Sequence, residues 1–404
     1  MIPAHICAKD ILLEGPFESD YSLAVVNREL ALALIENGVR VALHQRDNTT
    51  AYPVSEKFRK SHPSLAACLI SDPADVSCFF HSRYIYPPFT DQLRGVINGF
   101  HLYGWEETGF PAEDVDAFNN SLDIITVMST FVKEVLEANG VRVPIVVTGL
   151  GADHILRQPP VPTVLEGSTI GSSFRFLHIS SCFPRKAPDV LIEAFCQEFG
   201  PDEPVELVIK TFDNIHNRIF ELLAEADQKY RDHPPIRVIT RSFSLPEMRW
   251  LIESADCLIS ASRGEGFGLP VAEAMLLRTP VVATPIGGQA DLCNQENSWL
   301  VDYQMEEARS HLSRPGSQWA EPSIPSLRKQ LRAVFEAPEN LLRQKCEAAR
   351  RHIEENYTWS HVARKYLSAL ADGTSRRRAA LTVSRRRFGH PMRVGVMTTW
   401  NVRC

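Results

Sequence analysis

The chain has 404 residues, of which 44% are hydrophobic and 23% are charged, enough apolar material for two buried cores. A chain of this length exceeds the size at which a single core stops growing, so two domains are expected. The formal net charge of -6 argues against a nucleic-acid-binding protein, because such domains usually carry a strong basic excess.

The nine cysteines are scattered without CxxC spacing, so the sequence predicts neither a zinc site nor a disulfide framework. Free cysteines in apolar segments fit a reducing cytoplasm. No signal peptide is recognisable at the N-terminus, and no apolar run approaches the length of about 18 residues that suggests a membrane span. We expect a cytoplasmic protein whose only membrane contact would be peripheral, at the inner face.

The first part of the chain alternates short apolar strands with amphipathic helices, the pattern of a mostly parallel α/β sheet. Strands are predicted at 11–15, 39–44, 76–80, 95–100, 124–127 and 145–148, and helices over 21–37 and 130–139. Gly38 and Gly140 follow the two helices, and glycine commonly ends a helix. Residues 1–157 are therefore predicted to form one Rossmann-like domain.

Residues 158–173 are rich in Pro, Gly, Ser and Thr and lack periodicity, which predicts a linker. The alternation restarts at 174, with strands predicted at 174–179, 205–210, 236–239, 257–260, 281–283 and 299–301 and a helix over 189–199. A second Rossmann-like domain is assigned to residues 174–345. Ligands of open α/β sheets bind at the carboxyl ends of the strands, so both halves would face a central cleft.

The last third ends in helical sequence, from 324 to 371, followed by two arginine clusters. Residues 372–391 are predicted to be an Arg-rich linker. The apolar run at 392–397 is typical of an opening strand, so we expect residues 392–404 to begin a further α/β domain of a longer polypeptide.

The segment Arg263–Glu273 follows an apolar strand and opens a helix. Its glycines remove side chains so that a ligand can approach the backbone, and Pro270 suits a first helical turn. Free N–H groups at such a helix start can bind a pyrophosphate. Glu265 and Glu273 would flank that anion and hold hydroxyl groups. The alternative is that Glu273 is only a glutamate favoured by the helix dipole.

A second candidate is the strand-to-helix loop that ends in Arg185 and Lys186. Paired cations here could neutralise the charge of a departing pyrophosphate. The alternative is a solvated basic pair, but the helix dipole disfavours cations at a helix start.

Weaker candidates lie in other loops at predicted strand ends. They are the turn at Gly15, His101 and Glu106 after the strand at 95–100, and Asp291 in a strand-to-helix turn. A lone histidine is more often structural than functional, and the Gly15 segment could be a simple tight turn.

At these residues the chain resembles the retaining glycosyltransferases of the GT-B fold, namely glycosyltransferase family 4 (glycosyl transferases group 1). Glu265–Glu273 is similar to the Glu-x7-Glu motif of that family. The segment from Arg185 is similar to its Arg/Lys-Lys-Gly-x-Asp element, with Ala187 in place of glycine. Segments 21–31, 149–153 and 357–363 also resemble family elements, although Leu150 departs from the Asn-Gly-Val-Asp turn.

The resemblance implies two Rossmann-like domains facing a central cleft, with helices at 346–371 crossing back to the first domain. It implies that Arg185 and Lys186 bind a donor diphosphate, that Glu273 holds the ribose and that Glu265 holds the transferred sugar. His101, or Glu106 in its place, would touch the donor sugar. Further donor-binding residues implied at the same loops are Gly266, Phe267, Gly268, Leu269, Gly15, Ser180 and Asp291.

The implied activity is transfer of a hexosyl unit, mannosyl or glucosyl, from a nucleoside-diphosphate sugar to a glycan, polysaccharide or lipid-linked glycan acceptor, with retention of configuration. No cofactor or metal is implied, and residues 392–404 would begin another glycosyltransferase domain. Two alternatives stay open: a non-catalytic nucleotide-sugar-binding module of a multidomain glycosyltransferase, and a nucleotide-sugar epimerase of the same fold.

Overall fold

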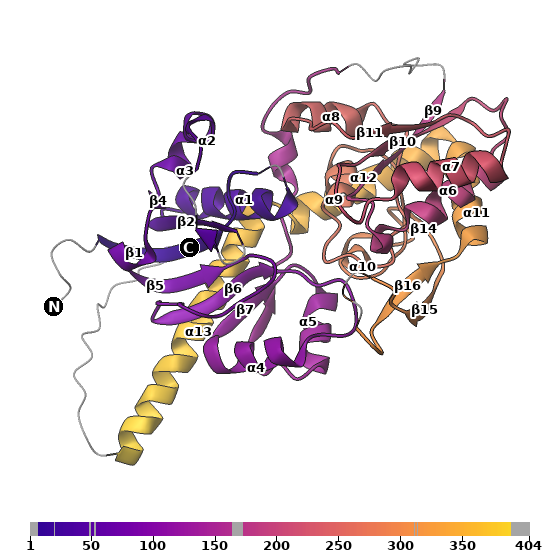
Figure 1. Cartoon of the computed structure of the whole chain (residues 1–404). Coiled ribbons are helices and arrows are strands. Elements are labelled where there is room, and N and C mark those ends of the chain that lie inside the picture. Colours follow the sequence, from indigo (N-terminus) through magenta and orange to yellow (C-terminus); the bar gives the residue numbers. More distant parts are fainter. Residues whose placement is uncertain are drawn as a thin grey trace.

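The computed structural model describes residues 7–19, 21–47, 50–51, 54–163, 173–310, 312 and 314–388. They form two α/β domains, each built on a mainly parallel sheet and placed side by side (Figure 1). The prediction of two Rossmann-like domains is confirmed.

The N-terminal domain has a sheet in the order β3-β2-β1-β5-β6-β7-β8, with β4 paired to β2. Only the β2–β3 pair among these is antiparallel. The strands are β1 (Cys7–Gly15), β2 (Val41–Asp47), β3 (Thr50–Ala51), β4 (Leu69–Ile70), β5 (Val76–Arg83), β6 (Ile97–Tyr103), β7 (Ile124–Val127) and β8 (Ile145–Val147). The helices are α1 (Ser22–Glu36), α2 (Glu56–Ser61), α3 (Pro63–Ala66), α4 (Ala112–Ser121) and α5 (Thr130–Ala138), with short 3-10 turns η1 (Pro73–Asp75) and η2 (Asp153–Leu156).

The C-terminal domain has a parallel sheet in the order β11-β10-β9-β12-β13-β14. Its strands are β9 (Phe174–Ile179), β10 (Val205–Lys210), β11 (Ile236–Ile239), β12 (Cys257–Ser260), β13 (Val281–Ala283) and β14 (Trp299–Leu300). Its helices are η3 (Pro184–Lys186), α6 (Pro188–Glu198), α7 (Ile219–Lys229), α8 (Leu245–Glu253), α9 (Leu269–Leu276) and α10 (Gln289–Leu292).

From β9 the chain adds strands towards one edge of this second sheet, and from β12 it adds them towards the other edge. The switch point lies between these two neighbouring strands. Crossover helices leave the two strands on opposite sides, so the loops that follow them diverge and leave room for a ligand. One of these loops carries Arg185 and Lys186, and the other carries Glu265. The fold therefore brings both predicted motifs to one switch point.

Two aromatic clusters illustrate how the domains are packed. Phe176 on β9 is fully buried and contacts the rings of Phe195 and Phe199 on the α6 side. In the N-terminal domain Phe118 on α4 packs edge-on against Phe100 and Tyr103 of β6. Each sheet is thus anchored to a covering helix by large apolar side chains, which leaves its loops free for polar residues.

An antiparallel hairpin follows β14, formed by β15 (Tyr303–Glu307) and β16 (Gln318–Pro322). It reaches the N-terminal domain, where the Thr108 N–H donates to the Gln318 carbonyl at 3.1 Å. Ser317 Oγ donates to Glu107 Oε2 at 2.9 Å. The hairpin therefore ties the C-terminal domain to the loop that follows β6.

Three helices complete the described chain: α11 (Ile324–Phe335), α12 (Glu339–Asn356) and α13 (Trp359–Phe388). The predicted boundary at 345/346 was wrong, because it falls inside α12, which still packs on α9 of the C-terminal domain. Helix α13 follows the break at Tyr357 and crosses over to contact α1, β6 and β7 (Figure 1).

The Arg-rich linker predicted at 372–391 was also wrong over 372–388, where α13 continues. Arginine is the commonest residue in this stretch and is a good helix former, so the cluster extends the helix. The remainder of that linker and the predicted opening strand at 392–404 lie outside the described residues, as do residues 164–172 of the predicted linker at 158–173.

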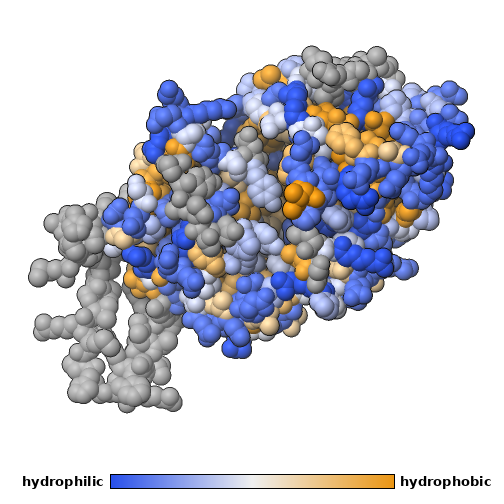
Figure 2. All heavy atoms as spheres, in the orientation of Figure 1, coloured by the Kyte–Doolittle hydropathy of each residue, from blue (hydrophilic) through white to orange (hydrophobic). Residues whose placement is uncertain are grey.

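On the face drawn in Figure 2 the surface is mostly hydrophilic, with hydrophobic residues in separate groups. Among the residues that the structure describes, every helix is too short or too polar to cross a membrane.

Candidate functional site

Lys186 and Glu265 form a close ion pair across the switch point. The Lys186 Nζ lies 2.5 Å from Glu265 Oε1, and both side chains are nearly buried. Ser262 Oγ also donates to Glu265 Oε1, at 2.8 Å. Burial alone would raise the pKa of Glu265, but the charges of Lys186 and Arg185 outweigh it and lower that pKa. Glu265 is therefore an ionised carboxylate held in place by two donors.

Arg185 lies beside this pair and points to the N-terminal domain. Its Nη2 is 3.1 Å from Glu106 Oε1. The nearby carboxylates of Glu106 and Glu265 raise the pKa of Arg185 although burial opposes them. The Arg185 Nε is buried and has no hydrogen-bond acceptor among the described residues. The Nε–H group of Arg185 is therefore available to donate a hydrogen bond to an anion.

Arg263, the first residue of the predicted motif, has a structural role. Its guanidinium binds Asp189 on α6 with two hydrogen bonds, of 2.9 and 2.7 Å, and Glu321 on β16 with two more, of 2.6 and 2.8 Å. The backbone N–H of Arg263 donates to the Arg185 carbonyl at 2.7 Å. Arg263 therefore joins the two switch-point loops to the hairpin, because bidentate pairs fix geometry as well as charge.

The glycines of the same loop are required by close contact with protein. A Cβ on Gly264 would lie 2.2 Å from the Glu106 carbonyl oxygen, and one on Gly266 would lie 2.8 Å from Met128 Sδ. Both neighbours belong to the N-terminal domain. The space above these glycines was predicted to hold a ligand, whereas in this structure the loop of Glu106 approaches it.

The helix α9 begins at Leu269, directly after Gly268, whose φ of 95° is in the left-handed region. Phe267 is buried and packs edge-on against Tyr357, with ring centroids 5.5 Å apart. Leu269 packs partly buried on the main core. Phe267 and Leu269 therefore anchor the start of α9, and Gly266 and Gly268 shape the backbone around it.

Glu273 lies on α9 and contacts a residue that the sequence analysis did not single out. Its Oε1 is 3.0 Å from His154 Nε2, and both side chains are buried. His154 belongs to η2, at the end of the N-terminal domain. The Glu-x7-Glu motif is therefore tied to the other domain at its second glutamate.

Ser180 and Asp291 make polar contacts at the edges of this site. Ser180 Oγ lies 2.7 Å from His178 Nε2 and accepts from the Cys182 N–H at 3.0 Å, which shapes the loop before Arg185. Asp291 Oδ2 accepts the Thr130 N–H at 2.8 Å. Asp291 therefore contacts the other domain at the start of α5.

Gly15 ends β1 at the carboxyl edge of the N-terminal sheet. A Cβ there would lie 2.4 Å from Asn27 Nδ2 and 2.5 Å from the Tyr84 carbonyl oxygen, so only glycine fits. Asn27 on α1 donates to the carbonyls of Pro16 and Tyr84, at 3.0 and 3.2 Å, and so secures the turn.

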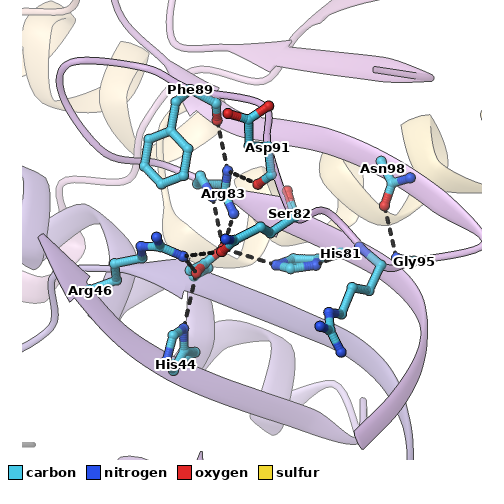
Figure 3. A network of polar contacts seen from close by, with 12 residues as sticks. His44, Arg46, His81, Ser82, Arg83, Phe89, Asp91, Gly95 and Asn98 are labelled. Atoms are coloured by element: carbon cyan, nitrogen blue, oxygen red, sulfur yellow. Dashed lines mark hydrogen bonds and ion pairs between the residues drawn. The ribbon is translucent and has the colours of Figure 1, made fainter. Parts of the chain in front are cut away.

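The residue before this turn, Glu14, is the centre of a buried polar network. Its carboxylate is contacted by His44, Arg46, His81 and Arg83, at distances of 3.0, 2.9, 3.1 and 2.7 Å. These four side chains are labelled in Figure 3. Burial would raise the pKa of Glu14, but the bonds from His44 and His81 and the charge of Arg83 lower it well below its ordinary value. Glu14 thus clamps three neighbouring strands beneath the Gly15 turn.

His101 lies in the core of the N-terminal domain and is fully buried. The expectation that it sits in a loop was wrong, because β6 continues to Tyr103 through a bulge at Leu102, whose φ is 52°. Its Nδ1 is 3.0 Å from Ser82 Oγ, and its Nε2 is 2.9 Å from Asn27 Oδ1. The structure therefore brings Glu106, and not His101, to Arg185.

Comparison with known proteins agrees with this geometry. Residues 173–312, which include both switch-point loops, match the family described as Glycosyl transferases group 1. This match supports a glycosyltransferase. It is 24% identical over 266 residues to a protein named putative glycosyltransferase YtcC of Bacillus subtilis (strain 168), a match that covers 61% of this chain and 59% of that protein.

Solved structures resemble the chain over nearly its full length. A glycosyltransferase from Rickettsia africae ESF-5 superposes with a TM-score of 0.65 at 17% identity, over 91% of this chain and 99% of that one. Anabaena Alr3699/HepE, solved with UDP-glucose, superposes with a TM-score of 0.64 at 13% identity, over 90% and 100%. At these identities the likeness establishes the fold alone. The two domains together have the GT-B fold.

Proposed function

We propose that the chain is a retaining glycosyltransferase of family 4 that transfers a hexosyl unit, mannosyl or glucosyl, from a nucleoside-diphosphate sugar to a glycan or polysaccharide acceptor. The observation that supports this most strongly is the convergence of Arg185, Lys186 and Glu265 at one switch point, with Glu273 on the helix that follows. Two cations and two carboxylates in this order suit a ligand with a diphosphate between two sets of hydroxyl groups.

Arg185 and Lys186 would hold the diphosphate. A phosphate oxygen would accept the buried N–H of Arg185 Nε, and Lys186 would add a second positive charge. As the bond between the sugar and the phosphate breaks, negative charge grows on the leaving oxygen, and fixed cations stabilise it. In this proposal the two side chains supply the positive charge, so a metal ion is not required.

Glu273 would accept hydrogen bonds from the ribose, and Glu265 from hydroxyl groups of the transferred sugar. The bond of Lys186 to one oxygen of Glu265 leaves the other oxygen for the sugar. Retention would follow from attack of the acceptor on the same face that the leaving diphosphate occupies, within a short-lived ion pair.

The acceptor would approach from the N-terminal domain, whose strands end at the Gly15 turn and at Glu106. His101 would act indirectly, since its bond to Asn27 fixes the side chain that secures this turn. A lipid-linked glycan is one acceptor of this kind, and a cytoplasmic protein at the inner face of a membrane would meet it there.

A panel of UDP- and GDP-sugars, assayed for nucleotide release with and without EDTA, tests this proposal. We expect one donor to be turned over with EDTA present, and Lys186→Ala and Glu265→Gln to lower kcat/KM about 100-fold or more. Lys229→Ala, which removes an exposed lysine elsewhere on the C-terminal domain, is the matched control and should leave kcat/KM unchanged.

Three outcomes would contradict the proposal. Nucleotide binding without turnover, with any acceptor offered, would indicate a binding module instead. Release of nucleotide together with a sugar of inverted ring stereochemistry would indicate an epimerase. Full activity in Lys186→Ala and Glu265→Gln would place the site elsewhere.

A further inference from the structure

The contact between His154 and Glu273 joins the two domains at a buried point. His154 is only 2% exposed and lies on η2, where the N-terminal domain ends. Its Nε2 is 3.0 Å from Glu273 Oε1 on α9. His101 was the histidine predicted to touch the donor sugar, whereas His154 is the one that contacts Glu273 of the motif.

The hydrogen bonds around His154 determine which of its nitrogens carries the proton. The indole Nε1 of Trp359 lies 3.2 Å from His154 Nδ1. An indole N–H can only donate, so Nδ1 is the acceptor and Nε2 carries the proton of the neutral ring. This protonated Nε2 lies 3.0 Å from Glu273 Oε1. One tautomer is therefore selected, and it is the one that binds the carboxylate.

Trp359 is itself fixed in position. Its backbone N–H donates to Asp153 Oδ1 at 2.7 Å, and its side chain is buried. Gly151 makes room for it, since a Cβ there would lie 2.5 Å from the ring. Trp359 on α13 contacts His154 on η2, and His154 contacts Glu273 on α9. The His154 ring therefore has little freedom to rotate, and the orientation of the Glu273 carboxylate is fixed as well.

We propose that His154 is a positioning residue for nucleoside recognition, which orients the Glu273 carboxylate so that it accepts the ribose hydroxyls of the donor. This inference rests on the proposed function, in which Glu273 holds the ribose. A carboxylate has two oxygens, and the contact with His154 is made by Oε1, so Oε2 stays available for the hydroxyl groups. Because His154 belongs to the N-terminal domain, the recognition also depends on how the two domains are placed.

The test compares a ribonucleotide with the same nucleotide lacking its ribose hydroxyls. The Kd values of UDP or GDP, whichever the wild-type chain binds, and of its 2′,3′-dideoxy analogue are measured by calorimetry. We expect the wild type to prefer the ribonucleotide by about tenfold or more, since hydrogen bonds to a charged group are strong. In His154→Phe this preference should fall to about twofold, with the affinity for the dideoxy analogue unchanged.

Two further variants separate positioning from simple structural support. His154→Gln keeps an N–H donor and should retain most of the preference. Trp359→Phe keeps the packing but removes the donor to Nδ1, so the ring is no longer held in one tautomer, and the preference should fall. Lys186→Ala, the matched control, should weaken both nucleotides by the same factor and leave their ratio unchanged.

The inference is overturned if His154→Phe and Trp359→Phe, shown by circular dichroism to be folded, keep the wild-type ratio, or if both nucleotides weaken in parallel. It is also overturned if the wild type binds both nucleotides equally well. A wild-type chain that binds neither UDP nor GDP contradicts the proposed function itself, and so the two failures are distinguishable.

Discussion

Glu106 Oε1 of the N-terminal domain lies 3.1 Å from Arg185 Nη2 of the C-terminal domain. The Glu106 carboxylate is therefore paired with Arg185, one of the two cations that are proposed to bind the donor diphosphate. This ion pair joins the domains only while Arg185 does not bind another anion.

Glu106→Gln should strengthen binding of the donor. Arg185 must leave its partner to bind the diphosphate, and leaving a neutral glutamine costs less free energy than leaving a carboxylate. The pair is partly exposed, and such pairs contribute up to about 1 kcal/mol, so the Kd of the donor should fall by about two- to fivefold. Titration calorimetry with the nucleoside diphosphate measures this directly. Glu113→Gln, an exposed glutamate on α4, is the matched control. Weaker binding in Glu106→Gln would instead support a direct contact between Glu106 and the donor.

Glu14→Gln should strongly destabilise the fold. The substitution keeps the shape but removes the charge that four donors share, three of them buried, so Arg83 is left buried without its carboxylate. Breaking a buried pair in this way costs about 3–5 kcal/mol. Urea denaturation of the variant should show this loss in the free energy of unfolding, whereas Glu36→Gln on the exposed side of α1 should change it little. Equal stability of the two variants would contradict the role given to the network.

Ser317→Ala tests the contact between the hairpin and the N-terminal domain. Ser317 Oγ donates to Glu107 Oε2 and accepts the Gly109 N–H, and the side chain is buried. Its loss leaves buried polar groups unsatisfied, which should lower the free energy of unfolding by about 1–3 kcal/mol. Ser71→Ala at an exposed site is the control. A variant as stable as this control would show that the hairpin contact contributes nothing.

The buried histidines predict how stability depends on pH. Burial lowers the pKa of His101 from its ordinary value of 6.5 to about 3, and burial lowers that of His178 to about 4. Below pH 6.5 these two histidines are protonated in the unfolded chain but stay neutral in the folded chain. The free energy of unfolding therefore falls as the pH is lowered towards 4. Each histidine contributes a slope of about 1.4 kcal/mol per pH unit.

His101→Gln should therefore have a shallower dependence on pH between 6.5 and 4, by about one proton. Urea denaturation at a series of pH values measures the slope for the variant and the wild type. The same slope in both would mean that His101 is protonated in the folded chain.

The two domains and the site loops could be predicted from sequence because their signals are local. Apolar strands alternate with helices, and the loops with Arg185 and Glu265 each follow an apolar strand directly. The sequence also predicted α1 closely, from its periodicity and from Gly38, whose φ is 75°.

The features that were missed depend on contacts between distant segments. The strand with His101 continues through a bulge that leaves no mark in the sequence, and this buries the ring. The strand Tyr303–Glu307 is exposed along its whole length and is held by pairing with β16, so no buried face marked the hairpin in the sequence. His154 is one residue past the family turn at 149–153, and only the return of α13 with Trp359 shows why a histidine is there.

The most direct test of the account is a crystal structure of the chain with the nucleoside diphosphate that it binds. We predict the diphosphate within hydrogen-bond distance of Arg185 and Lys186, and the ribose hydroxyls on the carboxylate of Glu273, still bonded to His154. A nucleotide bound with its diphosphate away from both cations would contradict the assignment of this switch point as the donor site.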